Sequence, residues 1–408
     1  MKPHKNINSL DVLRGLACLL VWLSHVRVTT RYFEDSRFDF IQVFSAWGRE
    51  SVVVFFMLSG IVINLSSQDK TDTGQYFTKR FIRIYPIYLA VLLICFLCDH
   101  LIFGNPIDSR TLIGNLLVSG TLQVNFVPTM PLNLVVWSIT CEVFFYIIFG
   151  LVYTLNKIKY VWIWLTICCL SIIYKISSGE NLYIGMTGHF IYLLNISFVW
   201  ILGYLVFEYR DKFCANLPVA LCGILLIPLL TRLHRLSSDI HELMYSFAGI
   251  CLIPLFIYLL RDYKTGNKER LNINHAYVAP AYIIGVILLW QHSNSLTISK
   301  ILYSLLPFTS FILYYKPVTV AVKRIYHHSK SFLGFFANIS YPIYLVHAPV
   351  MFIIYHFLPD QKVIGTLLII FLTISISYLF EIYLFKKPAR LLNAYRSARS
   401  VRIKQVPL

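Results

Sequence analysis

The sequence predicts an all-α integral membrane protein, a polytopic helical bundle of about 10–12 transmembrane helices. Of its 408 residues, 57% are hydrophobic and only 13% are charged, whereas charged residues make up about 25% of a soluble domain. The apolar residues gather in runs of about 20 residues, which is the length an α-helix needs to cross a bilayer. This composition excludes an ordinary soluble protein.

The predicted spans follow the apolar runs, and the first is expected to stay as an anchor because no small-residue cleavage site follows it. The spans lie at residues 10–28, 47–66, 81–103, 134–155, 160–176, 188–207, 216–231, 243–260, 277–291, 298–315, 331–357 and 363–385. A weaker apolar stretch at 111–127 is expected to form either a re-entrant or an interfacial segment.

Most of the 36 basic residues fall in alternate loops, which the positive-inside rule places in the cytoplasm together with both termini. Residues 1–390 are then one transmembrane domain, and 391–408 form a basic cytoplasmic tail. The net charge of +17 belongs to these loops, so the expected partner is the lipid bilayer and not nucleic acid. The nine cysteines lie almost all in apolar runs, which predicts no disulfide framework. No zinc-binding motif is present, and no metal is expected.

The first span carries two ionisable residues, Arg14 and His25. Eleven residues turn the helix about 20° beyond three full turns, so both side chains share one face, about 16 Å apart along the axis. Ionisable groups within a span are functional candidates. An imidazole near the outer end can act as a general base. The alternatives are a packed histidine and an arginine that snorkels to the inner boundary.

The fourth span opens with Trp137 and carries Ser138, Glu142 and Tyr146 at four-residue intervals, a polar stripe on an apolar helix. Because this helix is expected to run inward, Glu142 lies at a depth similar to that of His25. A carboxylate beside an imidazole fixes its tautomer and raises its basicity. The alternative is a structural ion pair between two helices.

Three other spans carry candidate residues. At the inner end of the third span, Arg80 and Arg83 point to the same side, where two guanidinium groups suit phosphate oxygens. Ordinary positive-inside anchoring is the alternative for this pair. Pro86 is expected to kink that helix. In the second span, Ser59-Gly60 allows close helix approach. His347 lies between two prolines in the span at 331–357, a pattern that predicts a broken helix lining a cavity.

Taken in order, these motifs resemble the membrane-bound acyltransferase 3 family, in its form without a soluble esterase-like domain. The resemblance covers most of the chain. It rests on Arg14-x10-His25, Ser59-Gly60, Arg80-x-x-Arg83-Ile-x-Pro86, Trp137-Ser138-x-x-x-Glu142 and the run Ser340-Tyr-Pro-Ile-Tyr-Leu-Val-His347. The chain departs from the family pattern at Val12, where many members have glycine, and at Val143, where many have a second glutamate. Lys386 replaces the usual acidic residue before Lys387-Pro388, and Glu381 lies nearby.

The resemblance implies a multi-pass enzyme of the cell inner (plasma) membrane, an O-acyltransferase. It implies acyl-CoA, most often acetyl-CoA, as the donor. The implied acceptor is a hydroxyl of a surface or secreted glycan such as O-antigen, lipopolysaccharide or exopolysaccharide. The donor phosphates are expected on Arg80 and Arg83 and near Arg14, with His25 as base and Glu142 as its orienting group. The expected substrate or channel residues are Ser59, Trp137, Ser138, Tyr146 and His347.

Two other functions are compatible with polar residues inside membrane spans. A transporter or flippase of a glycan or lipid-linked intermediate would need them too, although no inverted repeat is visible in the sequence. A structural or sensory membrane subunit is the third alternative, and it does not explain why the ionisable residues share depths.

Overall fold

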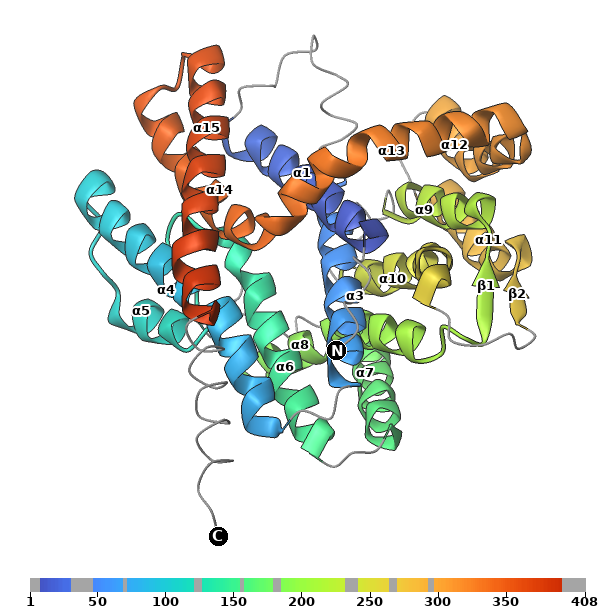
Figure 1. The fold of residues 1–408 in the computed structure, drawn as a ribbon, viewed down its shortest axis with the longest axis horizontal. Coiled ribbons are helices and arrows are strands. Elements are labelled where there is room, and N and C mark those ends of the chain that lie inside the picture. The colour runs from blue at the N-terminus through green and yellow to red at the C-terminus, as the bar shows by residue number, and fades with distance from the viewer. Residues whose placement is uncertain are drawn as a thin grey trace, which may run out of the picture. The chain divides into compact units, whose positions relative to one another are not determined.

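The computed structural model describes residues 8–30, 47–68, 72–120, 127–154, 158–178, 185–231, 241–263, 270–292 and 297–390 (Figure 1). Within these ranges the chain is almost entirely helical, which confirms the all-α prediction. The strands there, β1 (Phe213–Ala215) and β2 (Leu271–Ile273), form one short parallel pair. The predicted tail 391–408 and most of the segment 29–46 between the first two predicted spans lie outside the described residues.

The helices follow one another along the chain. Their bounds are α1 Asn8–Thr30, α3 Gly48–Ser67, α4 Thr73–Phe103, α5 Ser109–Leu116, η2 Leu134–Val136, α6 Trp137–Thr154, α7 Lys159–Ser178, α8 Gly185–Glu208, α9 Leu217–Thr231, α10 His241–Leu259, η5 Leu260–Tyr263, α11 His275–His292, α12 Thr297–Leu305, η6 Leu306–Tyr314, α13 Lys316–Asn338, α14 Ser340–Phe357, α15 Lys362–Phe380 and η7 Glu381–Lys386.

Six helical segments among the described residues are long and apolar enough to cross a membrane, so the protein is multi-pass. They lie at Ser9–Val26, Gly48–Ser67, Thr73–Phe103, Leu134–Val152, Met186–Glu208 and Lys362–Arg390. A bent pair, Lys300–Tyr314 with Lys316–Asn338, makes a seventh if it is one span. Shorter apolar helices fall in α9, α10 and α11. The larger number of 10–12 spans stays a prediction.

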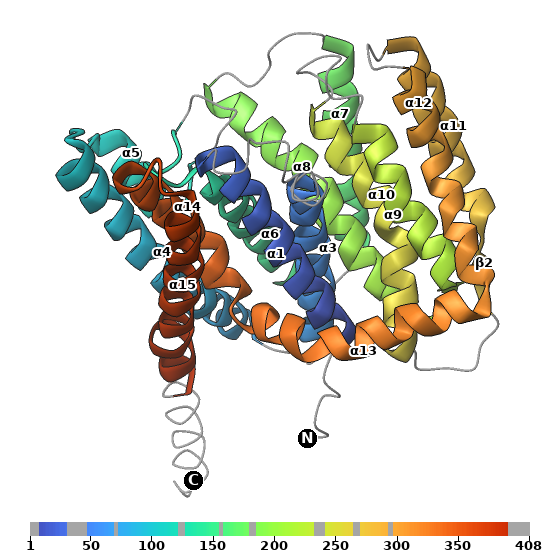
Figure 2. The ribbon, with the colours of Figure 1, turned by 90° about the horizontal axis from the view of Figure 1, so that it is seen from above.

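Two compact units alternate along the sequence, and each is described by itself. The first comprises Met1–Ala17, Trp47–Lys70 and Leu155–Ala337. The second comprises Cys18–Ala46, Thr71–Thr154 and Asn338–Leu408. In the second unit α4, α6, α14 and α15 lie side by side (Figures 1 and 2).

In the first unit the expected close helix approach at Ser59-Gly60 occurs between α3 and α8. A Cβ placed on Gly60 would lie 2.2 Å from the Trp200 carbonyl oxygen, and one on Gly203 would lie 2.1 Å from the Met57 carbonyl oxygen. The two glycines therefore bring the backbones together. Beside them the Trp200 indole Nε1 donates a hydrogen bond to Ser59 Oγ (3.1 Å).

Helix α4 begins earlier than the predicted third span and contains both arginines of the motif. Asp72 caps its first turn, accepting a hydrogen bond from the Gly74 backbone N–H (3.2 Å). The helix continues through Pro86 and ends at Gly104, whose φ of 72° is favourable for glycine. The segment 73–80, expected in a loop, is helical because this cap starts the helix at Thr73.

Helix α5 folds back beside α4, and whether it is re-entrant or interfacial stays a prediction. The Tyr85 and Tyr88 hydroxyls, about midway along α4, donate to the carbonyl oxygens of Leu116 (3.2 Å) and Asn115 (2.9 Å). The start of α5 is capped by Asp108, which accepts from the backbone N–H of two following residues. The hydrogen bond from the Thr111 hydroxyl, together with these backbone hydrogen bonds, lowers the pKa of Asp108.

The break expected in the predicted span at 331–357 is present. The span is divided between α13, which ends at Asn338, and α14, which begins at Ser340. A proline ring clashes with the carbonyl group four residues before it. For Pro342 that residue is Asn338, where the break falls. The residues 316–330, expected in a loop, form most of α13.

Candidate active site

The second unit brings together two histidines that lie far apart in the sequence. The ring centroids of His25 in α1 and His347 in α14 are 5.0 Å apart, with the rings tilted by 51°. His347 is fully buried, and its Nε2 has no hydrogen-bond partner among the described residues. His25 is half-buried and thus the more accessible of the two.

Both imidazoles are held in the same tautomer by their own helices. His25 Nδ1 lies 2.9 Å from the Val21 carbonyl oxygen, and His347 Nδ1 lies 2.9 Å from that of Ile343. A carbonyl oxygen only accepts hydrogen bonds, so each neutral ring carries its proton on Nδ1. Each Nε2 therefore has a free lone pair and can accept a proton.

The position of His347 is set by hydrogen bonds between α14 and the start of α6. The Ser138 hydroxyl donates to Tyr344 Oη (2.7 Å), and the Tyr344 hydroxyl donates to the Val135 carbonyl oxygen (3.1 Å). Asn133 Nδ2 donates to the Leu345 carbonyl oxygen (2.8 Å). Tyr344 also contacts His347 edge-on, with centroids 6.0 Å apart. The Ser138 motif and the late Tyr-x-x-His motif are thus parts of one structure.

Glu142 belongs to a second group of side chains, one turn further along α6. It accepts a short hydrogen bond from the Tyr146 hydroxyl. The Arg80 guanidinium lies over the rings of Tyr146 and Tyr76, 5.5 Å from each centroid, in the range of a cation–π contact. The Tyr76 hydroxyl donates to the Tyr146 carbonyl oxygen (3.1 Å) and so joins α4 to α6.

The expected pairing of Glu142 with His25 stays a prediction, and the observed contacts of the two side chains are with other residues. Among the described residues, His25 contacts Val21 and His347, and the Val21 carbonyl group holds its tautomer. Span assignments gave the two residues similar depths, but depth along a helix says nothing about the direction in which a side chain points. In the structure, Glu142 points toward Tyr146.

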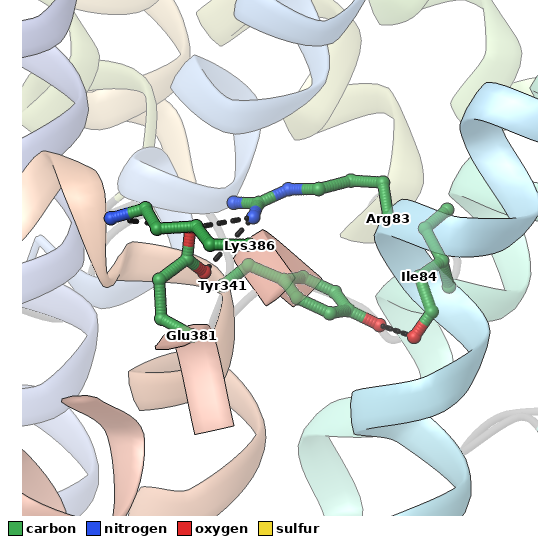
Figure 3. A network of polar contacts seen from close by, with 5 residues as sticks. All are labelled: Arg83, Ile84, Tyr341, Glu381 and Lys386. Carbon is green, nitrogen blue, oxygen red and sulfur yellow. Dashed lines mark hydrogen bonds and ion pairs between the residues drawn. The ribbon is translucent and has the colours of Figure 1, made fainter. Parts of the chain in front are cut away.

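Arg83 forms a third group with the end of α15 (Figure 3). Its Nη1 lies 3.0 and 2.9 Å from the two carboxylate oxygens of Glu381, which is only 3% exposed. Lys386 Nζ approaches the same carboxylate at 3.9 Å. The Arg83 guanidinium also lies 4.3 Å from the centroid of the Phe385 ring. Glu381 is the first residue of the π-helix η7.

Tyr341 links the arginine groups to the histidine pair. Its hydroxyl donates to the Ile84 carbonyl oxygen (2.9 Å, Figure 3), and the charges of Arg83 and Glu142 both act on it. Six residues of α14 separate Tyr341 from His347, which corresponds to about 9 Å along the helix axis. At the far end of α14, His356 contacts Phe103 of α4, with centroids 4.7 Å apart. The two helices therefore run in the same direction, with the arginines nearer the start of α4.

Residues 7–382 match the family described as "Acyltransferase domain", the acyltransferase 3 family. The chain belongs to this family. It is 29% identical over 154 residues to "Acyltransferase MdmB" of Streptomyces mycarofaciens, an alignment that covers 36% of this chain and 40% of that relative. The chain thus spans less than half the length of that relative. No solved structure matches the chain. The resemblance drawn from the sequence motifs is confirmed.

The remaining residues predicted for the acyltransferase site lie in other surroundings. Arg14, in the half of α1 that belongs to the first unit, pairs with Asp11 (3.2 Å). Ser59 packs against Trp200 in that same unit. Trp137 is buried as the first residue of α6. The continuous helix α1 keeps Arg14 and His25 at the expected spacing.

The sequence identified most of the candidate site residues but missed several of the side chains that contact them. Tyr76 and Tyr344 were not singled out, and Glu381 was noted only for its place near the end of the family pattern. The Tyr-x-x-His spacing puts Tyr344 one turn from His347, a signal that was available. For Glu381 no local signal existed, because its partner Arg83 is 298 residues away in the chain.

Proposed function

We propose that this acyltransferase moves an acyl group, most often acetyl, from cytoplasmic acyl-CoA to a hydroxyl of a surface or secreted glycan. The histidine pair carries the proposal, because a base with a free Nε2 lone pair is what a hydroxyl nucleophile requires. Family membership supports acyl transfer. The resemblance of the motifs supports a glycan acceptor such as O-antigen or exopolysaccharide and a place in the inner membrane.

In the proposed reaction, His25 Nε2 accepts the proton of the acceptor hydroxyl. The oxygen attacks the thioester carbonyl carbon, and the carbon–sulfur bond breaks. The departing thiolate takes the proton back from the His25 imidazolium, so one group serves as base and then as acid. The Val21 carbonyl group holds the Nδ1 proton throughout, and the buried Nε2 of His347 provides a neighbouring acceptor.

The donor phosphates bind at the arginines of α4. Arg80 presents its charge between two tyrosine rings, and Arg83 presents a guanidinium that is already engaged by a carboxylate. Guanidinium groups bind phosphate and carboxylate oxygens in the same geometry. Glu381 therefore occupies a position that a phosphate of the donor can take. With the phosphates there, the long thiol arm extends along α14 toward His25.

The test uses the full-length protein in nanodiscs with isotope-labelled acetyl-CoA and a cell-envelope glycan fraction. We expect release of the CoA thiol together with labelled O-acetyl groups on the glycan, and we expect His25→Ala to abolish both. His356→Ala is the matched control, because His356 lies exposed in α14 outside the pair. Absence of thiol release and of labelled glycan would overturn the proposal and favour a transporter or flippase.

A further inference from the structure

Helix α13 separates basic from apolar residues more sharply than the spanning helices do. Lys316, Lys323 and Lys330 recur every seven residues, so they lie along one face. Arg324 and His327 fall on the same side, and the helix contains no acidic residue. The basic residues are not interrupted by opposite charge anywhere along its 23 residues.

The other face of α13 is apolar and open. Val322, Ile325 and Phe332 recur at three- and seven-residue intervals, and Ile325 is 68% and Phe332 is 59% exposed. An apolar stripe opposite a basic stripe, with modest overall hydrophobicity, is typical of a helix that lies in a membrane interface. A spanning helix cannot carry four charged residues on one face in contact with lipid.

The direction of α13 agrees with this arrangement. It is bent by 94° from the preceding helical segment Lys300–Tyr314, and Figure 2 shows it crosswise to α11 and α12 of the same unit. Its last turns pack against the start of α1, where a Cβ on Gly15 would lie 2.0 Å from the Leu333 carbonyl oxygen. That end of α1 carries Arg14, which the charge pattern places at the cytoplasmic surface.

We propose that α13 is an interfacial helix that binds the anionic phospholipid headgroups of the cytoplasmic leaflet, with its apolar face inserted between the acyl chains. Anionic headgroups are the occupant because the charge of the helix is of one sign and lies along one line. A Lys or Arg near an anionic membrane surface strengthens attachment about fivefold. Screening shortens the range of this attraction to about 8 Å at physiological salt. The proposal does not depend on the acyl-transfer activity.

The experiment measures amide hydrogen exchange of α13 in the full-length protein, in nanodiscs of phosphatidylcholine alone and of phosphatidylcholine with phosphatidylglycerol. We expect exchange in α13 to slow at least tenfold with phosphatidylglycerol and to speed up again in high salt. The triple variant Lys323→Gln/Arg324→Gln/Lys330→Gln should lose most of that difference. The triple variant Arg110→Gln/Lys159→Gln/Lys362→Gln, which removes three exposed basic side chains elsewhere, should keep it.

Two results would overturn the proposal. One is equal protection of α13 in both lipid mixtures, unchanged by the α13 substitutions. The other is equal protection by inorganic phosphate or acetyl-CoA in detergent without anionic lipid, which would identify a soluble anion as the ligand. Thermal unfolding of each variant checks that the fold persists, so a folding defect is separated from a binding defect.

Discussion

Glu381→Gln is predicted to tighten binding of the acyl-CoA donor. In the structure both carboxylate oxygens of Glu381 lie within 3.0 Å of Arg83 Nη1. If the donor phosphate binds Arg83, it must first displace this carboxylate. A hydrogen bond to a charged group contributes about 1.5–3 kcal/mol. Arg83 is 30% exposed, so water replaces part of that energy. We therefore expect Glu381→Gln to strengthen donor binding by about 1.4 kcal/mol, which lowers the Kd tenfold.

The same substitution should lower stability. Glu381 is 3% exposed and lies between two cations, Arg83 and Lys386. Removing one partner of a buried pair leaves the remaining charge uncompensated, at a cost of up to about 3–5 kcal/mol. The partial exposure of both cations places the expected loss below that range, so the variant should fold with a lower melting temperature.

The assay is donor Kd by calorimetry on protein in nanodiscs, with acetyl-CoA as ligand. Arg83→Ala should weaken binding, and Arg83→Ala/Glu381→Gln should bind as Arg83→Ala does, because the carboxylate acts only through the guanidinium. Lys386→Gln is the control, since its nitrogen lies further from the carboxylate at 3.9 Å. Weaker donor binding in Glu381→Gln would refute the competition. The ion pair would then orient Arg83 for the phosphate.

Three further predictions follow from other parts of the structure. His25→Ala should lower turnover by about 10²–10⁴-fold. The losses in His25→Ala/Glu142→Gln should multiply, because Glu142 accepts a hydrogen bond from Tyr146 and His25 contacts His347; a double variant no slower than His25→Ala would support the carboxylate–imidazole pair. Gly60→Ala should lower the free energy of unfolding by about 1–3 kcal/mol through overpacking, measured by thermal unfolding in detergent; unchanged stability would mean that α3 and α8 separate easily. Capping lowers the pKa of Asp108 in the folded protein. Its stabilisation of α5 is therefore complete above about pH 4, the pKa of an unfolded aspartate, and is lost as the pH falls through the lower folded pKa. Hydrogen exchange in α5 that does not accelerate as the pH falls through that range would contradict this prediction.

Several features of the site could be predicted from the sequence because they lie within one helix. The spacing of Arg14 and His25 in α1, and of Ser138, Glu142 and Tyr146 in α6, follows from 3.6 residues per turn. Membrane class follows from composition, since the bilayer accepts only segments that satisfy their own backbone hydrogen bonds. The helix break near Pro342 was also predicted, because a proline ring clashes with the preceding turn of a helix.

Only the tertiary structure decided which side chains meet across helices. Depth estimates paired His25 with Glu142, whereas packing of α14 beside α1 places His347 there. Arg83 was predicted as a phosphate-binding residue, and the structure shows it paired with the buried carboxylate of Glu381 at the end of α15. A helix sequence determines which residues share a face, because the backbone geometry is local. Which face meets which depends on the rotation and neighbours of every helix, and those are set by packing across the whole unit.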